Sequence, residues 1–285
     1  MNMKYFPFTN DYVFNKVLSS NEDIAKHILK LAADNELTDE TIQQMHIRHQ
    51  EVVDPLLDAK SSRFDVYLFT NKSDADMEMQ TVKNRVSPKR ARYYVSAHDV
   101  DVLEPGEPYD KLPKIIIVFI CTFDPFDQGY RKYIIKERVF TDELCKNDIT
   151  NACKYDNECV KIFLNSKQAK YNNVSKELKQ FLDYVNTQKT TNVFTERIEE
   201  KVSFINKRDR RILMSFQEDL NDAKKAGIEE GKASGFIEGQ ASGLKNEKIA
   251  IAKTMIAKNF NNELISEITK LSFDEIKDLR NESIN

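Results

Sequence analysis

The chain has 285 residues, of which 40% are hydrophobic and 31% are charged, with a formal net charge of −3 at pH 7. This length allows one sizeable core and a smaller unit, and the charge excludes a protein that coats nucleic acid by bulk electrostatics. The longest apolar run, residues 115–121, is too short for the roughly 18 residues of a membrane span. The opening MNMKYFPFTNDY lacks the layout of a signal peptide. We therefore expect a soluble, cytoplasmic protein.

The four cysteines, at positions 121, 145, 153 and 159, show no C-x-x-C spacing. Zinc sites and thiol redox motifs usually need that spacing, and Cys121 lies inside the apolar run. We expect reduced thiols without a disulfide framework or a zinc site, which agrees with a cytoplasmic protein.

Helical periodicity opens the chain. Thr9 or Asn10 can cap a first helix, and a second helix follows with Ile24, Ile28, Leu29 and Leu31 at helical spacing. Residues 63–70 and 75–82 then alternate between apolar and polar positions around a polar turn, which predicts a β-hairpin.

The middle of the chain returns to a helix and then to strands. Ser87 and Pro88 supply a cap and a first residue for a helix that extends to about residue 97. Residues 114–121 predict a buried central strand and residues 131–140 one more strand, with further helices from about residue 174. This order predicts an α/β fold, a mixed β-sheet flanked by helices, with a C-terminal helical tail.

The predicted hairpin gathers polar side chains on one face. With an even-numbered loop, Asp65 lies opposite Gln80 and Tyr67 lies opposite Glu78. Residues that pair directly share a face, so Asp65, Glu78 and Gln80 project to the same side. The same register turns another set toward a core: Val66, Leu68, Met77 and Met79.

Such a face suits a divalent cation. Two neighbouring carboxylates repel each other unless a cation neutralises them, and Mg²⁺ accepts one or two carboxylates while it keeps several waters. That arrangement serves metal-assisted phosphodiester hydrolysis. Asp65 and Glu78 are therefore candidate catalytic ligands of Mg²⁺ or Mn²⁺, and Gln80 is a candidate for orienting water or the phosphate. The alternative interpretation is a solvated acidic strand face.

A basic cluster follows the hairpin without an intervening acid, and it consists of Lys83, Arg85, Lys89, Arg90 and Arg92. Positive side chains beside an acidic metal site are what a DNA backbone requires, so these residues are candidate DNA contacts. A soluble helix face is the alternative.

The tail is marked by glycine. Five of the seven glycines lie at every fourth residue, at positions 227, 231, 235, 239 and 243. On a helix they form one stripe that lets another backbone approach, which predicts helix–helix contact and a homo-oligomer; a flexible linker is the alternative. We predict three parts: a nuclease-like domain at 1–190, a helical linker at 191–246 and a small helical unit at 247–285.

Several ordered blocks resemble a known family. KSSRFDVY, MEMQ, KRARYY and GEPYDKLPKIIIVFI, together with the opening TNDYVFNKVL and the glycine-punctuated tail, resemble the Rpn-type recombination-promoting nucleases, also called PD-(D/E)XK nuclease family transposases. The resemblance implies a restriction-endonuclease-like core. It also implies divalent-metal-dependent DNA cleavage, linked to recombination and transposition of mobile elements.

Carried over residue by residue, the resemblance makes Asp65 the first motif acid and Glu78 the second. Gln80 occupies the position that most of the wider superfamily fills with lysine, and a neutral amide supplies only dipoles there, so weak activity is an expectation. Asp11 matches an acid of the opening block and is either a further metal ligand or a residue that favours the helix N-terminus. The alternative function is a catalytically degenerate nuclease fold that binds DNA or protein and self-associates.

Overall fold

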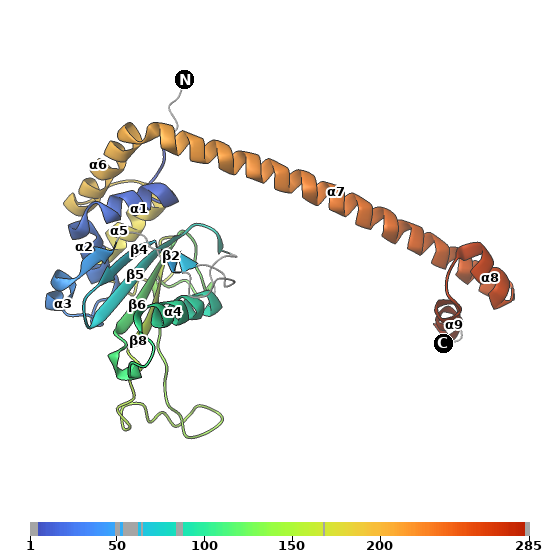
Figure 1. Cartoon of the computed structure of the whole chain (residues 1–285), viewed down its shortest axis with the longest axis horizontal. Helices are drawn as coiled ribbons and strands as arrows, with labels where there is room; N and C mark the ends of the chain where they lie inside the picture. Colours follow the sequence, from blue (N-terminus) through green and yellow to red (C-terminus); the bar gives the residue numbers. More distant parts are fainter. Residues whose placement is uncertain are drawn as a thin grey trace. The chain divides into compact units, whose positions relative to one another are not determined.

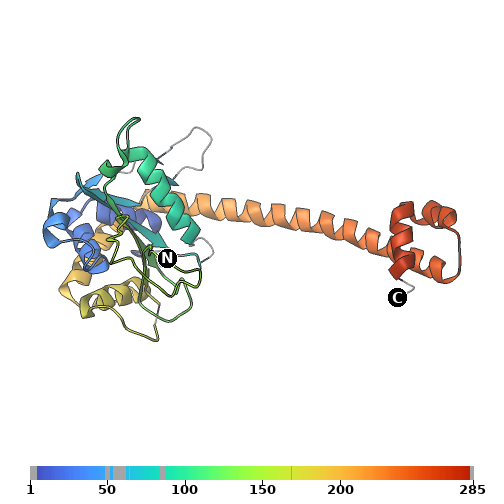
Figure 2. The same cartoon turned by 90° about the horizontal axis from the view of Figure 1, so that it is seen from below.

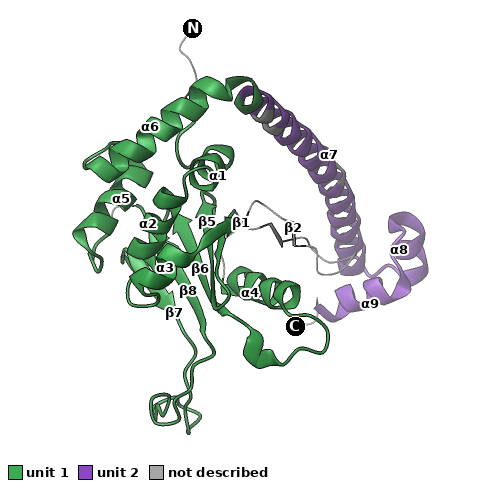
Figure 3. Ribbon diagram, turned by 60° about the vertical axis from the view of Figure 1, so that its left-hand side comes forward, with its two compact units in different colours: residues 1–213 green, residues 214–285 purple. Residues whose placement is uncertain are grey.

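The computed structural model describes residues 5–48, 52–53, 62–63, 65–83, 88–167 and 169–282. The chain forms two compact units, residues 1–213 and residues 214–285, which Figure 3 shows in green and purple. The finer division at residues 190 and 246 stays a prediction. Two observations bear on it: the helix at 193–208 belongs to the first unit, and one continuous helix passes through residue 246.

The first unit is built on a six-stranded mixed sheet, in the order β1-β4-β5-β6-β8-β7. β5, β6 and β8 are parallel neighbours, and the remaining pairs are antiparallel. A separate ladder joins β2 (Val52–Val53) to β3 (Ser62–Arg63). The strands of the main sheet are β1 (His46–Arg48), β4 (Val66–Phe69), β5 (Ser73–Gln80), β6 (Lys114–Cys121), β7 (Lys132–Ile135) and β8 (Cys159–Asn165).

Helices cover both faces of the sheet (Figures 1 and 2). The larger core lies under four of them: α1 (Asp11–Ser19), α2 (Glu22–Ala32), α5 (Lys176–Thr187) and α6 (Val193–Arg208). The opposite face is covered by α4 (Pro88–Val102), with a smaller core between. The short α3 (Asp39–Gln44) follows α2, and the 3₁₀ turn η2 (Tyr109–Lys111) precedes β6. The fold is therefore the predicted α/β class, a mixed sheet flanked by helices.

Strand alternation sorts the side chains between the two cores. Val66, Leu68, Met77 and Met79 all lie in the larger core, as predicted. Tyr67, on the other parity, joins Phe119 and Phe163 in the smaller core under α4. Because side chains of a strand point alternately to opposite faces, the parity of this assignment fixes which face Asp65, Glu78 and Gln80 share.

The hairpin register differs from the predicted one by two residues. β4 pairs with β5 through Val66 and Met77, and through Tyr67 and Asp76, so the predicted pairing of Tyr67 with Glu78 is wrong. The cause is a tighter turn: the Thr70 hydroxyl accepts the backbone N–H groups of Lys72 and Ser73, at 3.1 and 2.8 Å, and β5 begins at Ser73. A slip of two residues preserves the shared face.

Four further elements can be compared with the predictions from local sequence. The Asn10 side chain caps α1 by accepting the Val13 N–H at 3.2 Å, and Pro88 is the first residue of α4, both as predicted. The predicted strand at 131–140 is shorter, because β7 ends at Ile135. β8 is missed by the sequence reading because Lys161 interrupts its apolar run.

The second unit is helical. It contains most of α7 (Arg210–Ala257), together with α8 (Asn262–Thr269) and α9 (Phe273–Glu282). Ser272 and Glu275 exchange hydrogen bonds at the start of α9, a capping box. None of the helices in the described part of the chain combines the length and the apolar character that a bilayer span requires. The small core of this unit consists of Ala252, Ile256, Ile265, Leu271, Ile276 and Leu279.

All four cysteines are free thiols, as predicted. Cys121 and Cys159 are buried in strands, whereas Cys145 and Cys153 are exposed.

Candidate active site

Asp65 and Glu78 lie side by side at the start of β4 and the end of β5. The backbone N–H of Asp65 donates to Glu78 Oε1 at 3.1 Å, and the backbone N–H of Met79 donates to Asp65 Oδ2 at 3.1 Å. Each carboxylate is therefore oriented by the backbone of the other strand. Glu78 is only 1% exposed, whereas Asp65 is half-buried, so the pair lies at the boundary between the protein interior and solvent.

Gln80, Arg90 and Tyr94 complete the surroundings of Glu78. Gln80 Nε2 donates to Glu78 Oε2 at 3.1 Å. The Arg90 guanidinium approaches both side chains, with Nη1 at 3.4 Å from Gln80 Oε1 and Nη2 at 3.4 Å from Glu78 Oε2. Nη2 also donates to the Tyr94 hydroxyl at 2.7 Å. The structure thus brings the three predicted residues together and adds a cation and a phenol from α4.

Arg90 is not a free surface cation, because its side chain faces the acidic residues of the site. The sequence placed it among five basic side chains, yet its guanidinium points to Glu78 and Gln80 and stacks over the Tyr94 ring at 5.1 Å from the centroid. Arg90 and Tyr94 are four residues apart on α4, so both occupy one face of the helix. That spacing was the available signal for Tyr94, which sequence reasoning did not single out.

Asp76 is a further acid at the site that sequence reasoning missed. It precedes Glu78 by two residues on β5 and so shares its face. Its side chain is fully buried, and neither Oδ atom has a partner in hydrogen-bond geometry among the residues that the structure describes, although the Val66 backbone and the Glu78 carboxyl lie near enough to act on its pKa. The same parity argument that selected Glu78 would have selected Asp76. Unpaired buried oxygens mark a place where a cation would be favourable.

Burial and mutual repulsion shift the titration of these acids. Burial raises the pKa of Asp65 to about 6, with a further rise from the charge of Asp11, while hydrogen bonds from Met79 and Asn15 oppose it. Burial and the charge of Asp65 raise the pKa of Glu78 to about 8, although Arg90 opposes the rise. The pKa of Asp76 lies well above its ordinary value, first because of burial and then because of neighbouring Glu78. A bound cation would favour the ionised forms.

Asp11 stands at the edge of this group. It is the exposed first residue of α1, and its charge acts on Asp65. Within the described ranges no three His, Cys, Asp or Glu side chains are grouped so that they alone would hold a metal ion. An ion that takes one or two carboxylates and retains water, as Mg²⁺ does, fits this donor set; Asp11 as a further ligand stays a prediction.

The remaining basic residues are distributed unevenly. Lys89 and Arg92 are exposed on α4. Lys83 is paired with Asp127 at 2.5 Å, which offsets part of its charge. Arg85 lies outside the described residues. Their contact with DNA stays a prediction.

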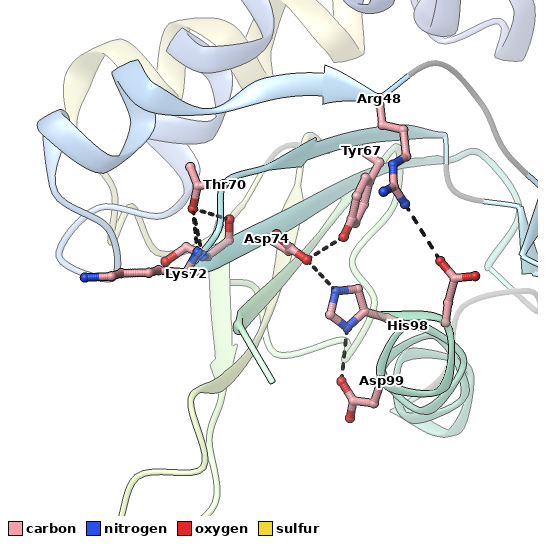
Figure 4. Close-up of polar contacts among 9 residues, drawn as sticks. Arg48, Tyr67, Thr70, Lys72, Asp74, His98 and Asp99 are labelled. Carbon is pink, nitrogen blue, oxygen red and sulfur yellow. Dashed lines mark hydrogen bonds and ion pairs between the residues drawn. The ribbon is translucent and has the colours of Figure 1, made fainter. Parts of the chain in front are cut away.

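A second buried polar cluster lies farther along the same faces of β5 and α4 (Figure 4). His98 Nε2 lies 2.8 Å from Asp74 Oδ2, and its Nδ1 lies 3.0 Å from Asp99 Oδ1. The Tyr67 hydroxyl donates to the same Asp74 oxygen at 2.5 Å. Burial lowers the pKa of His98, but the hydrogen bonds and charges of Asp74 and Asp99 outweigh it and raise the pKa above its usual value. Both ring nitrogens therefore face carboxylates, an arrangement that favours the protonated ring.

Comparison with known proteins places this site in a family. Residues 8–148 match the sequence profile described as PD-(D/E)XK nuclease family transposase. Searches of curated proteins and of solved structures returned no match. The matched segment contains Asp11, β4, β5, α4 and β6, and so every residue of the site. Through residues 8–148, the chain belongs to the PD-(D/E)XK nuclease family transposases.

Proposed function

We propose that the chain is a divalent-metal-dependent DNA endonuclease that hydrolyses phosphodiester bonds and acts in recombination or transposition of mobile elements. Family membership supports nuclease activity in general. The observation that carries the finer proposal is the Asp65–Glu78 pair, in which a half-buried and a fully buried carboxylate each accept a backbone N–H from the other strand. Such a pair is costly without a cation and suited to one.

Asp65 and Glu78 would hold Mg²⁺ or Mn²⁺, and we include Asp11 as a candidate third ligand from α1. Both carboxylates supply the hard oxygen ligands that these ions prefer. When bound, the ion supplies Lewis-acid stabilisation of the charge that develops on the phosphate oxygens. The unpaired oxygens of Asp76, two residues before Glu78 on β5, also favour a divalent cation with oxygen ligands.

The other side chains act on the phosphate and on the DNA strand. Gln80 supplies an amide dipole where most of the superfamily has a lysine, so the positive charge must come from elsewhere. Arg90, 3.4 Å from Gln80 Oε1, is the residue we propose for that role, because a guanidinium matches the geometry of phosphate oxygens. Backbone phosphates outside the site would be contacted by Lys83, Arg85, Lys89 and Arg92.

We also propose that the chain self-associates through α7. An added Cβ at any of the five tail glycines, from Gly227 to Gly243, would meet no heavy atom within 4 Å among the described residues. Exposed apolar side chains adjoin the stripe: Ile228 is 48%, Phe236 65% and Leu244 60% exposed. Glycine costs a helix roughly 1 kcal/mol per position relative to alanine, which close approach of a second copy would offset.

A plasmid assay tests the enzymatic proposal. Supercoiled plasmid should be nicked in Mg²⁺ or Mn²⁺ and left intact in EDTA, and Asp65→Ala or Glu78→Ala should abolish nicking. Asp39→Ala is the matched control, because Asp39 is an exposed acid that pairs with Lys30 on another face. Nicking that survives both site variants would overturn the proposal. DNA binding without metal-dependent nicking would favour the degenerate, binding-only module, for which Gln80 at the lysine position is the motivating observation.

A further inference from the structure

α4 and β5 face each other through two matched rows of polar side chains, here named the α4–β5 seam. On α4 the row recurs at every fourth residue and consists of Arg90, Tyr94 and His98. On β5 it recurs at every second residue and consists of Gln80, Glu78, Asp76 and Asp74. The helix row spans about 12 Å and the strand row about 20 Å. The long Arg90 side chain makes up part of this difference, because it contacts both Gln80 and Glu78.

The two ends of the seam are tied differently. At one end Arg90 reaches Gln80 and Glu78, each at 3.4 Å. At the other end the buried His98, 1% exposed, bridges Asp74 on β5 and Asp99 on α4 itself (Figure 4). The contacts at the His98 end are shorter, at 2.8 and 3.0 Å, than those of Arg90. The remote end of the seam is therefore the firmer one.

Few large apolar side chains are buried along α4. The buried residues of α4 are Ala91, Tyr94, Ala97 and His98. α1, by comparison, buries Val13, Phe14, Val17 and Leu18. Free energy from apolar burial scales with the area buried, and two alanines bury little of it. The contacts at each end of the seam thus act together with the packing of Tyr94 against Phe119, whose ring centroids lie 6.2 Å apart, to set where along β5 the helix sits.

We propose that His98 is a positioning residue of the nuclease site: by clamping α4 to Asp74 of β5, it holds Arg90 and Tyr94 against Glu78. This inference rests on the proposed function. His98 itself lies at the far end of the seam, so its effect on cleavage passes through the helix to Arg90. A displacement of about 1 Å at a site can lower a rate on the order of 100-fold. A small shift of α4 caused by loss of the His98 contacts would therefore lower the cleavage rate.

A double-mutant cycle on the full chain tests the route of this effect. Single-turnover DNA cleavage in Mn²⁺ is measured for wild type, His98→Gln, Arg90→Ala and the double variant. We expect His98→Gln to lower the rate by about tenfold or more, and the double variant to be no slower than Arg90→Ala alone. Losses that multiply in the double variant, or an unchanged rate in His98→Gln, would overturn the proposal.

Hydrogen exchange gives a readout that needs no activity. In the metal-free chain, His98→Gln should speed exchange in residues 88–95 of α4 and leave β6 unchanged. Exchange that rises equally in all elements would mean a general loss of stability and would count against the proposal, as would unchanged exchange in α4. His27→Gln is the matched control, since His27 also pairs with a carboxylate, Glu177 at 2.8 Å, on a different helix.

Two further outcomes remain decisive. If the wild type cleaves nothing, the proposed function fails while the exchange experiment still judges the clamp. If His98→Gln does not fold, Asp99→Asn replaces it, because Asp99 is 35% exposed and its loss removes one of the two partners of the ring. The same changes in rate and exchange, smaller in size, are then expected, and their absence would overturn the proposal.

Discussion

Three acids of the candidate site, Asp65, Asp76 and Glu78, should make the stability of the chain depend on pH. Asp65, Asp76 and Glu78 all have a pKa above the ordinary value of the free side chain, mainly because of burial. An acid whose folded pKa is raised stabilises the fold below its unfolded pKa, and this contribution is lost as pH rises through the folded pKa. The metal-free chain should therefore lose stability toward alkaline pH, and a divalent cation should restore it.

Metal binding should accordingly tighten with pH. Between pH 6 and pH 8, the interval spanned by the pKa values of Asp65 and Glu78, the cation displaces protons from both side chains. Calorimetric titration with Mn²⁺ should show an affinity that rises across this interval, with protons released to the buffer. In Glu78→Gln the binding should be weaker and less dependent on pH. An affinity that is constant across the interval would contradict the assignment of these two ligands.

Asp76→Asn isolates the cost of one buried acid. At alkaline pH the unfolded chain ionises this side chain and the folded chain resists it, so the variant should be more stable than the wild type without metal. The difference in free energy of unfolding between the variant and the wild type should grow as pH rises above the ordinary pKa of aspartate, by up to about 1.4 kcal/mol per pH unit. Urea unfolding at several pH values measures it. A variant that is less stable than wild type at pH 8, near the pKa of Glu78, would contradict the unpaired state of Asp76.

At the scale of elements, the hairpin shows how far sequence reasoning reaches. Alternation in β4 and β5 was enough to put Asp65, Glu78 and Gln80 on one face, because parity depends only on the strand period. The register could not be predicted, because it depends on the Thr70 side chain that closes the turn. Parity alone is thus a sound basis for a candidate site, and exact pairing is not.

The contribution of α4 required the folded structure. From the sequence, Arg90 was predicted to be one of several surface cations. Its neighbours in the sequence do not show that α4 packs along β5 with this side chain inward. The His98–Asp74 contact joins residues on different elements, and no sequence motif predicts it. The sequence therefore predicted Asp65, Glu78 and Gln80 as site residues, whereas Asp76, Tyr94 and the inward position of Arg90 were found only in the structure.

Replacing glycines of the α7 stripe by alanine should change helix stability and self-association in opposite directions. The double substitution Gly231→Ala and Gly239→Ala should stabilise the helix of the tail by about 1 kcal/mol per position and so raise its helical content. The same methyl groups should weaken self-association, because they would stand between two closely approaching helices. Light scattering and circular dichroism measure both effects, with Lys232→Ala as a control beside the stripe. An oligomer that survives the double substitution unchanged would remove the stripe from the interface.

At the scale of the whole molecule, the proposed functions separate by unit. Every residue of the candidate active site, from Asp11 to His98, lies in the first unit. The glycine stripe and the small helical core lie in the second. We therefore assign the proposed cleavage and the proposed assembly to different parts of the chain, and variants in one unit should leave the property proposed for the other intact.

The most direct test of the central claim is the cleavage rate of Glu78→Gln. An amide oxygen can still accept the Asp65 N–H, which lies 3.1 Å from Glu78 Oε1, so the hairpin keeps its geometry while the site loses one negative charge. We expect cleavage of plasmid DNA in Mn²⁺ to fall by at least about 100-fold while the variant stays folded. A folded Glu78→Gln variant that cleaves at the wild-type rate would contradict it.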